Sequence, residues 1–355
     1  MTQSTSGKVA QARVSRRAFL ASLGATLGAI AAAGCGTAPA TPPTATADAK
    51  AAGPSVAPAD KAESTSIKFA TVASGAVGFL THVMGQRKID SKHGLTLELV
   101  PADPAAAEKA LLVKQVDAGL FPIISAARAN TEGQPIRVFG PLLWSHNYGL
   151  TYADRPYSKL ADLRGKKIAT LDPISGTYQA TQLLAAAEGL NFEKDFQVVT
   201  SPAPAVLAFL ERGDVEGIIH FEPNIGNLLT TGKYREFLDY NAEWERLTGQ
   251  NMFSIGLAAH EPWIAQHRDI ARRLLEASLD SAQVINADPS VFGQYAAYLG
   301  LDTPEKVKAA QERMPKIYPI EWNQAIAENA ESIIRRAVEQ RILNTAPDRP
   351  VTIML

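Results

Sequence analysis

The residues of this sequence that could do chemistry form none of the common catalytic arrangements. We find no G-x-S-x-G nucleophile elbow, no H-E-x-x-H zinc motif and no phosphate-binding P-loop. His260-Glu261 begins like a zinc motif but lacks a second histidine at the helical spacing. The single cysteine, Cys35, excludes an internal disulfide framework and any zinc or iron–sulfur site built from several cysteines. We therefore predict a protein that is not an enzyme and that holds neither a metal nor another cofactor.

The composition indicates a globular protein without affinity for polyanions. The chain has 355 residues, with 35 Lys plus Arg against 36 Asp plus Glu and a formal net charge of -1. This length is enough for about two domains of ordinary size. The balanced charge gives no reason to expect a nucleic-acid binder or a polybasic membrane module.

The first 34 residues have the features of an export signal. Arg16-Arg17 lies in a basic stretch without acidic residues, and an uncharged run rich in Ala and Gly follows from 18 to 34. This arrangement resembles a twin-arginine signal. The alternative is a buried or membrane-spanning helix, but a span needs about 20 strongly apolar residues. We predict that residues 1–34 are a signal peptide and that Arg16 and Arg17 direct export.

The lone thiol lies directly after this run. Ala32-Ala33-Gly34-Cys35 resembles a bacterial lipobox, in which signal peptidase II leaves a lipidated cysteine at the N-terminus. The usual pattern has Leu where this chain has Ala32, so cleavage at a general small-residue site remains the alternative. A free thiol at the start of a secreted protein would be exposed to reaction, which favours lipidation. Residues 35–65 then form a lipidated Cys and a flexible tether rich in Ala, Pro and Thr, which places the protein on the outer face of the cell membrane, towards a periplasm or the exterior.

The remaining chain alternates strand and helix patterns and contains an internal match. Residues 69–72 (FATV) match 168–171 (IATL) at an offset of 99, and each run leads to a Ser-Gly pair, Ser74-Gly75 or Ser175-Gly176. Val116-Asp117 matches Val215-Glu216 at the same offset. The identities are few, so chance similarity remains open. We predict an α/β protein with two lobes of one topology and mostly parallel sheets.

The expected lobes are discontinuous in sequence. Lobe I comprises residues 66–145 plus 256–355, and lobe II comprises residues 146–255. The chain should cross between them near 144–150 and again near 252–258. The helical pattern after Pro262 is expected to complete lobe I.

Four runs in this order resemble periplasmic solute-binding proteins of ABC importers. The runs are 162–169 (DLRGKKIA), Ser175-Gly176-Thr177, 213–217 (GDVEG) and Phe221-Glu222-Pro223. The most similar group includes receptors for taurine, alkanesulfonate and nitrate, for thiamine-pyrimidine precursors and for riboflavin, and the resemblance covers about 66–345. It implies a two-lobed Venus-flytrap fold, in which two doubly wound sheets are joined by a two-strand hinge and a ligand lies in the cleft. It also implies an ABC permease and its ATPase subunits as partners, and no nucleic acid.

Five segments are expected to face that cleft, because ligands of open parallel sheets bind at the carboxyl ends of the strands. They are residues 74–77, 121–125, 144–148, 175–178 and 220–224. None of them contains Lys or Arg, which argues against an anion, and several contain aromatic residues. The expected ligand contacts are Ser74, Gly75, Phe121, Trp144, Asn147, Tyr148, Ser175, Gly176, Thr177, Tyr178, His220 and Glu222. For Phe121, Phe221 and His220 core packing is the alternative, and Glu222 could instead cap the helix that follows Pro223.

Aromatic faces with a few hydrogen-bonding groups suit a planar heterocycle. We therefore expect riboflavin as the ligand, with a thiamine-pyrimidine precursor next. A receptor for taurine, alkanesulfonate or nitrate is the alternative, since helix N-termini alone can bind an anion. A cytoplasmic enzyme of the thiamine-pyrimidine synthesis type is disfavoured by the export signal, and a purely structural surface lipoprotein would have no cavity between the five segments.

Overall fold

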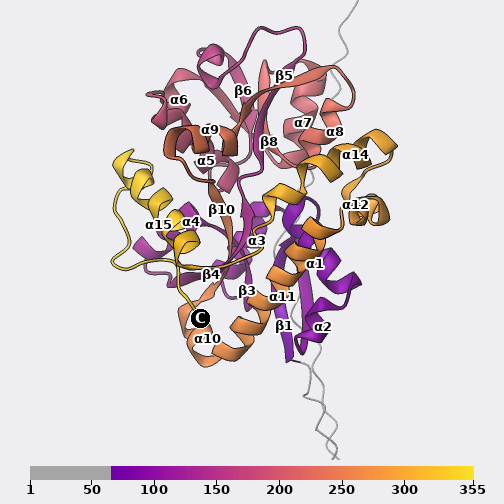
Figure 1. Ribbon diagram of the computed structural model, residues 1–355. Helices are drawn as coiled ribbons and strands as arrows, with labels where there is room; N and C mark the ends of the chain where they lie inside the picture. The colour runs from indigo at the N-terminus through magenta and orange to yellow at the C-terminus, as the bar shows by residue number, and fades with distance from the viewer. Residues whose placement is uncertain (1–64) are drawn as a thin grey trace, which may run out of the picture. The chain divides into compact units, whose positions relative to one another are not determined.

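The computed structural model describes residues 65–355, which form two five-stranded sheets with helices packed around them (Figure 1). The predicted export signal with Arg16 and Arg17, and the predicted lipidation site Cys35, lie outside the described residues. No helix within 65–355 is both long and apolar enough to cross a bilayer.

The first sheet has the spatial strand order β2-β1-β3-β10-β4. Its strands are β1 (Thr65–Val72), β2 (Leu95–Ala102), β3 (Ala118–Pro122), β4 (Ile136–Trp144) and β10 (Phe253–His260). β3 is buried at every position, and β4 is buried up to its last residue, Trp144. These strands read as continuous apolar runs because helices cover both faces of the sheet.

The second sheet has the order β7-β6-β8-β5-β9. Its strands are β5 (Asn147–Tyr152), β6 (Lys167–Thr170), β7 (Gln197–Thr200), β8 (Gly217–Phe221) and β9 (Tyr234–Asp239). β5 follows β4 after only two residues, so the chain enters the second sheet directly from the first.

The two sheets share one topology. β1 and β6 hold equivalent places, as do β3 and β8. The first match at the offset of 99 lies along β1 and β6, and the second directly precedes β3 and β8. In each sheet one strand runs against the others: β10 is antiparallel to β3 and β4, and β5 is antiparallel to β8 and β9. Each reversed strand is the first strand after the chain crosses from the other sheet, so it enters its own sheet from the opposite end. The predicted α/β class with two mostly parallel sheets is confirmed.

The helices between the strands cover the two sheets in turn. Those inserted in the first sheet are α1 (Ala76–Gln86), α2 (Ile89–Lys92), α3 (Pro104–Leu112) and α4 (Ile123–Thr131). Those inserted in the second sheet are η1 (Leu160–Leu163), α5 (Gly176–Ala187), α6 (Phe192–Asp195), α7 (Ala203–Arg212), α8 (Asn224–Leu229) and α9 (Tyr240–Thr248).

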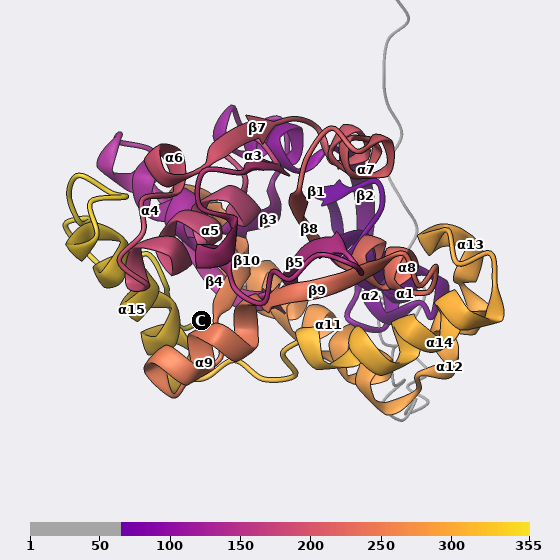
Figure 2. The same ribbon diagram turned by 90° about the horizontal axis from the view of Figure 1, so that it is seen from above.

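The helices after β10 return mainly to the first sheet. They are α10 (Glu261–Gln266), α11 (Arg268–Ala287), α12 (Ser290–Gln294), α13 (Ala296–Leu299), α14 (Pro304–Arg313), η2 (Pro315–Ile317) and α15 (Gln324–Glu339). α11 packs against α1 and α15 against α4, while α14 lies beside α8 of the second sheet (Figure 2). The stacked rings of Phe79 and Phe292, 4.9 Å apart, join α1 to α12 in the main core. The C-terminal helices therefore complete the first sheet's layers, while α14 and α15 also contact the second sheet's side.

Candidate ligand-binding site

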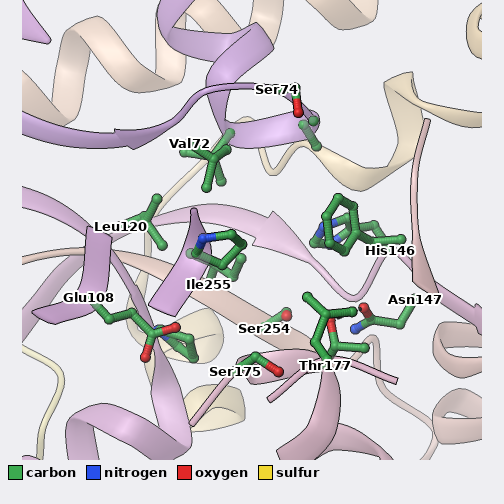
Figure 3. Close-up of a pocket in the computed structure, with 18 residues that line it drawn as sticks. Val72, Ser74, Glu108, Leu120, His146, Asn147, Ser175, Thr177, Ser254 and Ile255 are labelled. Atoms are coloured by element: carbon green, nitrogen blue, oxygen red, sulfur yellow. Dashed lines mark hydrogen bonds between the residues drawn. The ribbon is translucent and has the colours of Figure 1, made fainter. Parts of the chain in front are cut away.

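A pocket lies between the two sheets, at the carboxyl ends of β1, β3, β6 and β8 (Figure 3), with an empty volume of about 510 Å³ that includes its opening to solvent. The first sheet and its helices provide Val72, Ser74, Gly75, Ala76, Val77, Pro104, Glu108, Leu120 and Pro122. The second provides His146, Asn147, Leu171, Ser175, Gly176, Thr177 and Phe221, and β10 adds Ser254 and Ile255. No Lys or Arg occurs among these lining residues.

Two helix N-termini open into the pocket, one from each sheet. β1 leads into α1, and its equivalent β6 leads into α5, so the shared topology brings both helix starts to the same place. The hydroxyl of Ser175 accepts a hydrogen bond from the Tyr178 N–H at 3.3 Å and caps α5. Gly75 holds the capping position before α1, but it has no side chain and provides no such cap. The first N–H groups of these helices can bind an electronegative group.

Glycine is needed where the two sides of the pocket approach each other. Gly75 has φ 92° and ψ -172°, a conformation that residues with a side chain rarely adopt. A Cβ atom at Gly75 would lie 3.3 Å from the ring of Phe221 on the opposite side. A Cβ atom at Gly176 would lie 3.1 Å from the Cβ atom of Pro122. The sheets are thus in contact on both sides of the pocket.

Asn147 and Thr177 present amide and hydroxyl groups to the pocket, and hydrogen bonds hold both side chains in place. The Thr177 hydroxyl donates to Asn147 Oδ1 at 2.8 Å, and Asn147 Nδ2 donates to the Ser145 hydroxyl at 3.4 Å. His146 lies beside them, and its Nδ1 atom has no hydrogen-bond partner. Burial lowers the pKa of His146 to about 4, so the imidazole is neutral near pH 7. This end of the pocket is polar and uncharged.

Glu108 on α3 is the one acidic side chain that lines the pocket, and sequence reasoning missed it. It is 1% exposed, and its Oε2 atom has no hydrogen-bond partner among residues 65–355. Burial raises its pKa to about 8, against the opposing effects of a hydrogen bond with Ser125 and the charge of Arg128. A signal was present in the sequence: Glu108 lies among Ala107, Ala110 and Leu111 on the buried face of a short helix, where an acid is unusual.

Six of the expected contacts line the pocket: Ser74, Gly75, Asn147, Ser175, Gly176 and Thr177. Phe221, for which core packing was the alternative, lines it as well. The other six expected contacts do not line the pocket. Four of these six are aromatic, namely Phe121, Trp144, Tyr148 and Tyr178. Phe121 is 1% exposed in the main core, and the Trp144 ring packs edge-on against Phe253 with centroids 6.1 Å apart.

Tyr148 and Tyr178 also point away from the pocket. The guanidinium of Arg313 lies over the Tyr148 ring, 4.4 Å from its centroid. The Tyr178 hydroxyl donates to Glu193 at 2.9 Å. Because successive side chains of a strand point to opposite faces, Asn147 faces the pocket and Tyr148 does not.

The side chains of His220 and Glu222 already form hydrogen bonds with neighbouring protein groups. His220 is fully buried, with Nε2 3.1 Å from the Ala203 carbonyl and Nδ1 accepting from the Phe221 N–H at 2.9 Å. Glu222 accepts hydrogen bonds from Arg313 Nε at 2.5 Å and from the Gly226 N–H of α8 at 3.1 Å. The capping alternative for Glu222 therefore describes its position better than contact with a ligand.

No group of three or more His, Cys, Asp or Glu side chains within the described part of the chain could hold a metal ion. The site offers instead two helix N-termini, a neutral polar end and one buried carboxyl group. Such an arrangement can bind a small polar solute.

Comparisons with known proteins agree with this geometry. A family model described as NMT1/THI5 like matches residues 91–291. The taurine-binding periplasmic protein of Escherichia coli (strain K12) is 25% identical over 195 residues, which are 53% of this chain and 57% of that protein. The match thus spans little more than half the length of that relative.

Two solved structures show the same fold. The alkanesulfonate-binding protein from Xanthomonas axonopodis pv. citri, bound to MOPS, has a TM-score of 0.68 with 16% identity, and the match covers 83% of this chain and 100% of that one. The periplasmic aliphatic sulphonate binding protein from Escherichia coli has a TM-score of 0.63 with 18% identity, covering 82% and 94%. The two-lobed periplasmic-binding-protein fold is confirmed.

Proposed function

Because the chain belongs to the NMT1/THI5-like family, we propose that it is the substrate-binding protein of an ABC import system. It captures a small solute outside the cytoplasmic membrane and delivers it to a permease with its ATPase subunits. One observation carries this proposal: helix N-termini from two different sheets open into one pocket. A solute held there touches both lobes, and closure of one on the other can report that the pocket is filled.

An organic sulfonate, such as taurine or an alkanesulfonate, is the ligand class that we propose first. The N–H groups at the starts of α1 and α5 suit a sulfonate oxygen, and the helix dipoles favour a negative group there. The relatives named above are a taurine-binding protein and two sulfonate-binding proteins. Nitrate belongs to the same class of small anions.

Riboflavin, with a thiamine-pyrimidine precursor next, is the second candidate. The pocket has no basic side chain, and the rings of Phe221 and His146 could contact a planar ligand. The argument from aromatic walls is nevertheless weaker than the sequence indicates, because Phe121, Trp144, Tyr148 and Tyr178 do not line the pocket. The sulfonate class is therefore favoured over our sequence-based preference.

Calorimetry on the chain without residues 1–35 tests the proposal. We expect taurine or an alkanesulfonate to bind with a dissociation constant in the micromolar range or below, and riboflavin, formylaminopyrimidine and nitrate to bind more weakly. Ser74→Trp places a large ring at the exposed edge of the pocket and should abolish binding. Ser91→Trp is the matched control on the exposed surface of α2 and should bind normally. Tight binding of riboflavin alone would overturn the ligand class, and no binding by any of the five would overturn the transport role.

Export and anchoring are part of the proposal and rest on sequence alone. Cys35→Ser should release the body from the membrane fraction or leave an unprocessed precursor. Replacing Arg16 and Arg17 by Lys should block export. Detergent-dependent membrane retention of a processed Cys35→Ser form would reject the lipid anchor, and normal export of the Lys variant would indicate the general secretory route.

A further inference from the structure

We propose that Glu108 contacts the ligand and makes the site select solutes that carry an ammonium group as well as an anionic group, so that amino-sulfonates are preferred over simple alkanesulfonates. This inference rests on the proposed function and names the substrate class of the same pocket.

The first argument is the unpartnered oxygen of Glu108. A buried carboxyl oxygen without a hydrogen bond is costly, and native proteins rarely retain one without a reason. Oε2 of Glu108 has no partner within the described chain, although the side chain is 1% exposed and lines the pocket. A ligand N–H group entering the pocket would supply the missing donor.

The second argument is the distribution of charge in the pocket. The starts of α1 and α5 carry partial positive charges that attract an anion. With no Lys or Arg in the lining, no cationic side chain there stabilises the ionised form of Glu108, and burial favours its protonated form in the empty pocket. The ammonium of an amino-sulfonate would supply the missing positive charge and pair with the carboxylate, whereas a simple alkanesulfonate offers no such partner.

The third argument is the placement of Glu108 within the pocket. Figure 3 shows its carboxyl group on one side of Ser175 and Ser254, with His146 and Asn147 on the other side. The pocket therefore has a carboxyl end and a neutral polar end, and the helix starts next to Ser74 and Ser175 also line it. A short ligand can place its ammonium group at the carboxyl group and its anionic group at a helix start.

The fourth argument is that Glu108 is held where the two sides meet. Its neighbour Ser125 on α4 donates to the Ile174 carbonyl at 3.1 Å and lies 3.0 Å from Gln179 Nε2 on α5. Ile174 and Gln179 belong to the second sheet's side, so this contact joins the two sides next to the carboxyl group. Glu108 is thus positioned by a contact between the two sides as well as by α3.

The test compares taurine with 1-propanesulfonate, which replaces the ammonium by a methyl group at nearly the same size. Calorimetry on the chain without residues 1–35 should show that taurine binds at least about tenfold more tightly. Glu108→Gln, which keeps the shape but cannot ionise to pair with an ammonium, should reduce this preference to below about twofold, mainly by weakening taurine binding. Glu108→Asp, which keeps the carboxyl group, should retain more of the preference than Glu108→Gln.

Glu98→Gln is the matched control, because Glu98 lies on β2 of the same lobe with an exposed side chain and does not line the pocket. It should leave both affinities and their ratio unchanged, and a thermal unfolding curve should verify that each variant is folded. An unchanged ratio in Glu108→Gln, or equal affinities in the unmodified protein, would overturn the inference alone. If neither sulfonate binds the unmodified protein, the proposed ligand class is wrong, and this inference falls with it.

Discussion

Two buried carboxyl groups, one on each side of the cleft, have opposite surroundings. Glu222 follows β8 in the second sheet and is bound by Arg313 from α14, whose guanidinium also contacts Glu236 and lies over Tyr148. Glu108 on α3 has no cation bonded to it and keeps one oxygen unpartnered. Burial raises the pKa of both groups, and only at Glu222 does a bonded guanidinium oppose the effect. A buried acid with a cation is part of the structure, whereas one without a partner is available to a ligand.

The largest effect should come from removing the cation of the structural pair. Arg313→Met would leave Glu222 buried without a counter-charge, and we expect the free energy of unfolding to fall by about 3–5 kcal/mol. Urea unfolding measures this loss. The double variant Arg313→Met with Glu222→Gln should recover a large part of it, since the uncompensated charge is gone. A loss below about 1 kcal/mol would mean that the pair does not fasten α14 to the second sheet's side.

The next effect concerns the unpaired acid and depends on pH. The pKa of Glu108 is raised to about 8 in the folded protein, above the ordinary value of 4.5, so folding favours the protonated form. This contribution to stability is fully present below pH 4.5 and is lost as the pH rises to about 8. The Gln side chain of the Glu108→Gln variant does not titrate. The free energy of unfolding of the variant relative to that of the wild type should therefore rise by on the order of a few kcal/mol between pH 5 and pH 9.

Urea unfolding of both proteins at pH 5 and pH 9 provides the measurement, because other titrating groups cancel in the difference between them. A difference that stays constant with pH would show that Glu108 is ionised in the folded protein, and the contrast with Glu222 would then disappear.

A smaller effect is expected where the two sides of the pocket touch. Gly75→Ala forces a side chain into φ 92° and towards the Phe221 ring, which should cost about 1–3 kcal/mol and weaken ligand binding. Gly85→Ala, in the exposed last turn of α1 with nothing within 4 Å of the added Cβ atom, is the control and should not destabilise the protein. Equal unfolding midpoints for the two variants would contradict a requirement for glycine at position 75.

The smallest effect should come from an exposed acid. Glu98 lies 4.0 Å from Lys68, and both side chains are more than half exposed. Glu98→Gln should change the free energy of unfolding by less than about 0.5 kcal/mol at any pH from 5 to 9. A larger change would mean that exposed charges also affect stability here, and the effects at Glu108 and Glu222 would need correction for it.

The sequence by itself determined the elements and the repeated topology. Residues 69–72 and 168–171 are apolar runs, each followed by a Ser-Gly pair, and they form the equivalent strands β1 and β6 with a helix after each. Strand and helix patterns are local properties of the chain, and a Ser at a helix start acts through bonds to its near neighbours. Six of the twelve expected contacts line the pocket for this reason, and most of them lie at those helix starts.

Only the tertiary structure decided which side chains face the pocket. Along β5 the alternation of faces turns Asn147 into the pocket and Tyr148 towards Arg313, and the direction of each depends on how the strand enters its sheet. Arg313 is 91 residues from Glu222 in the chain, so no local pattern could reveal that the carboxyl group is already paired. Glu108 acquires its place only when α3 packs beside a pocket completed by the other sheet. Burial and charge pairing depend on neighbours that are distant in sequence, and for that reason they follow from the packing and not from any segment alone.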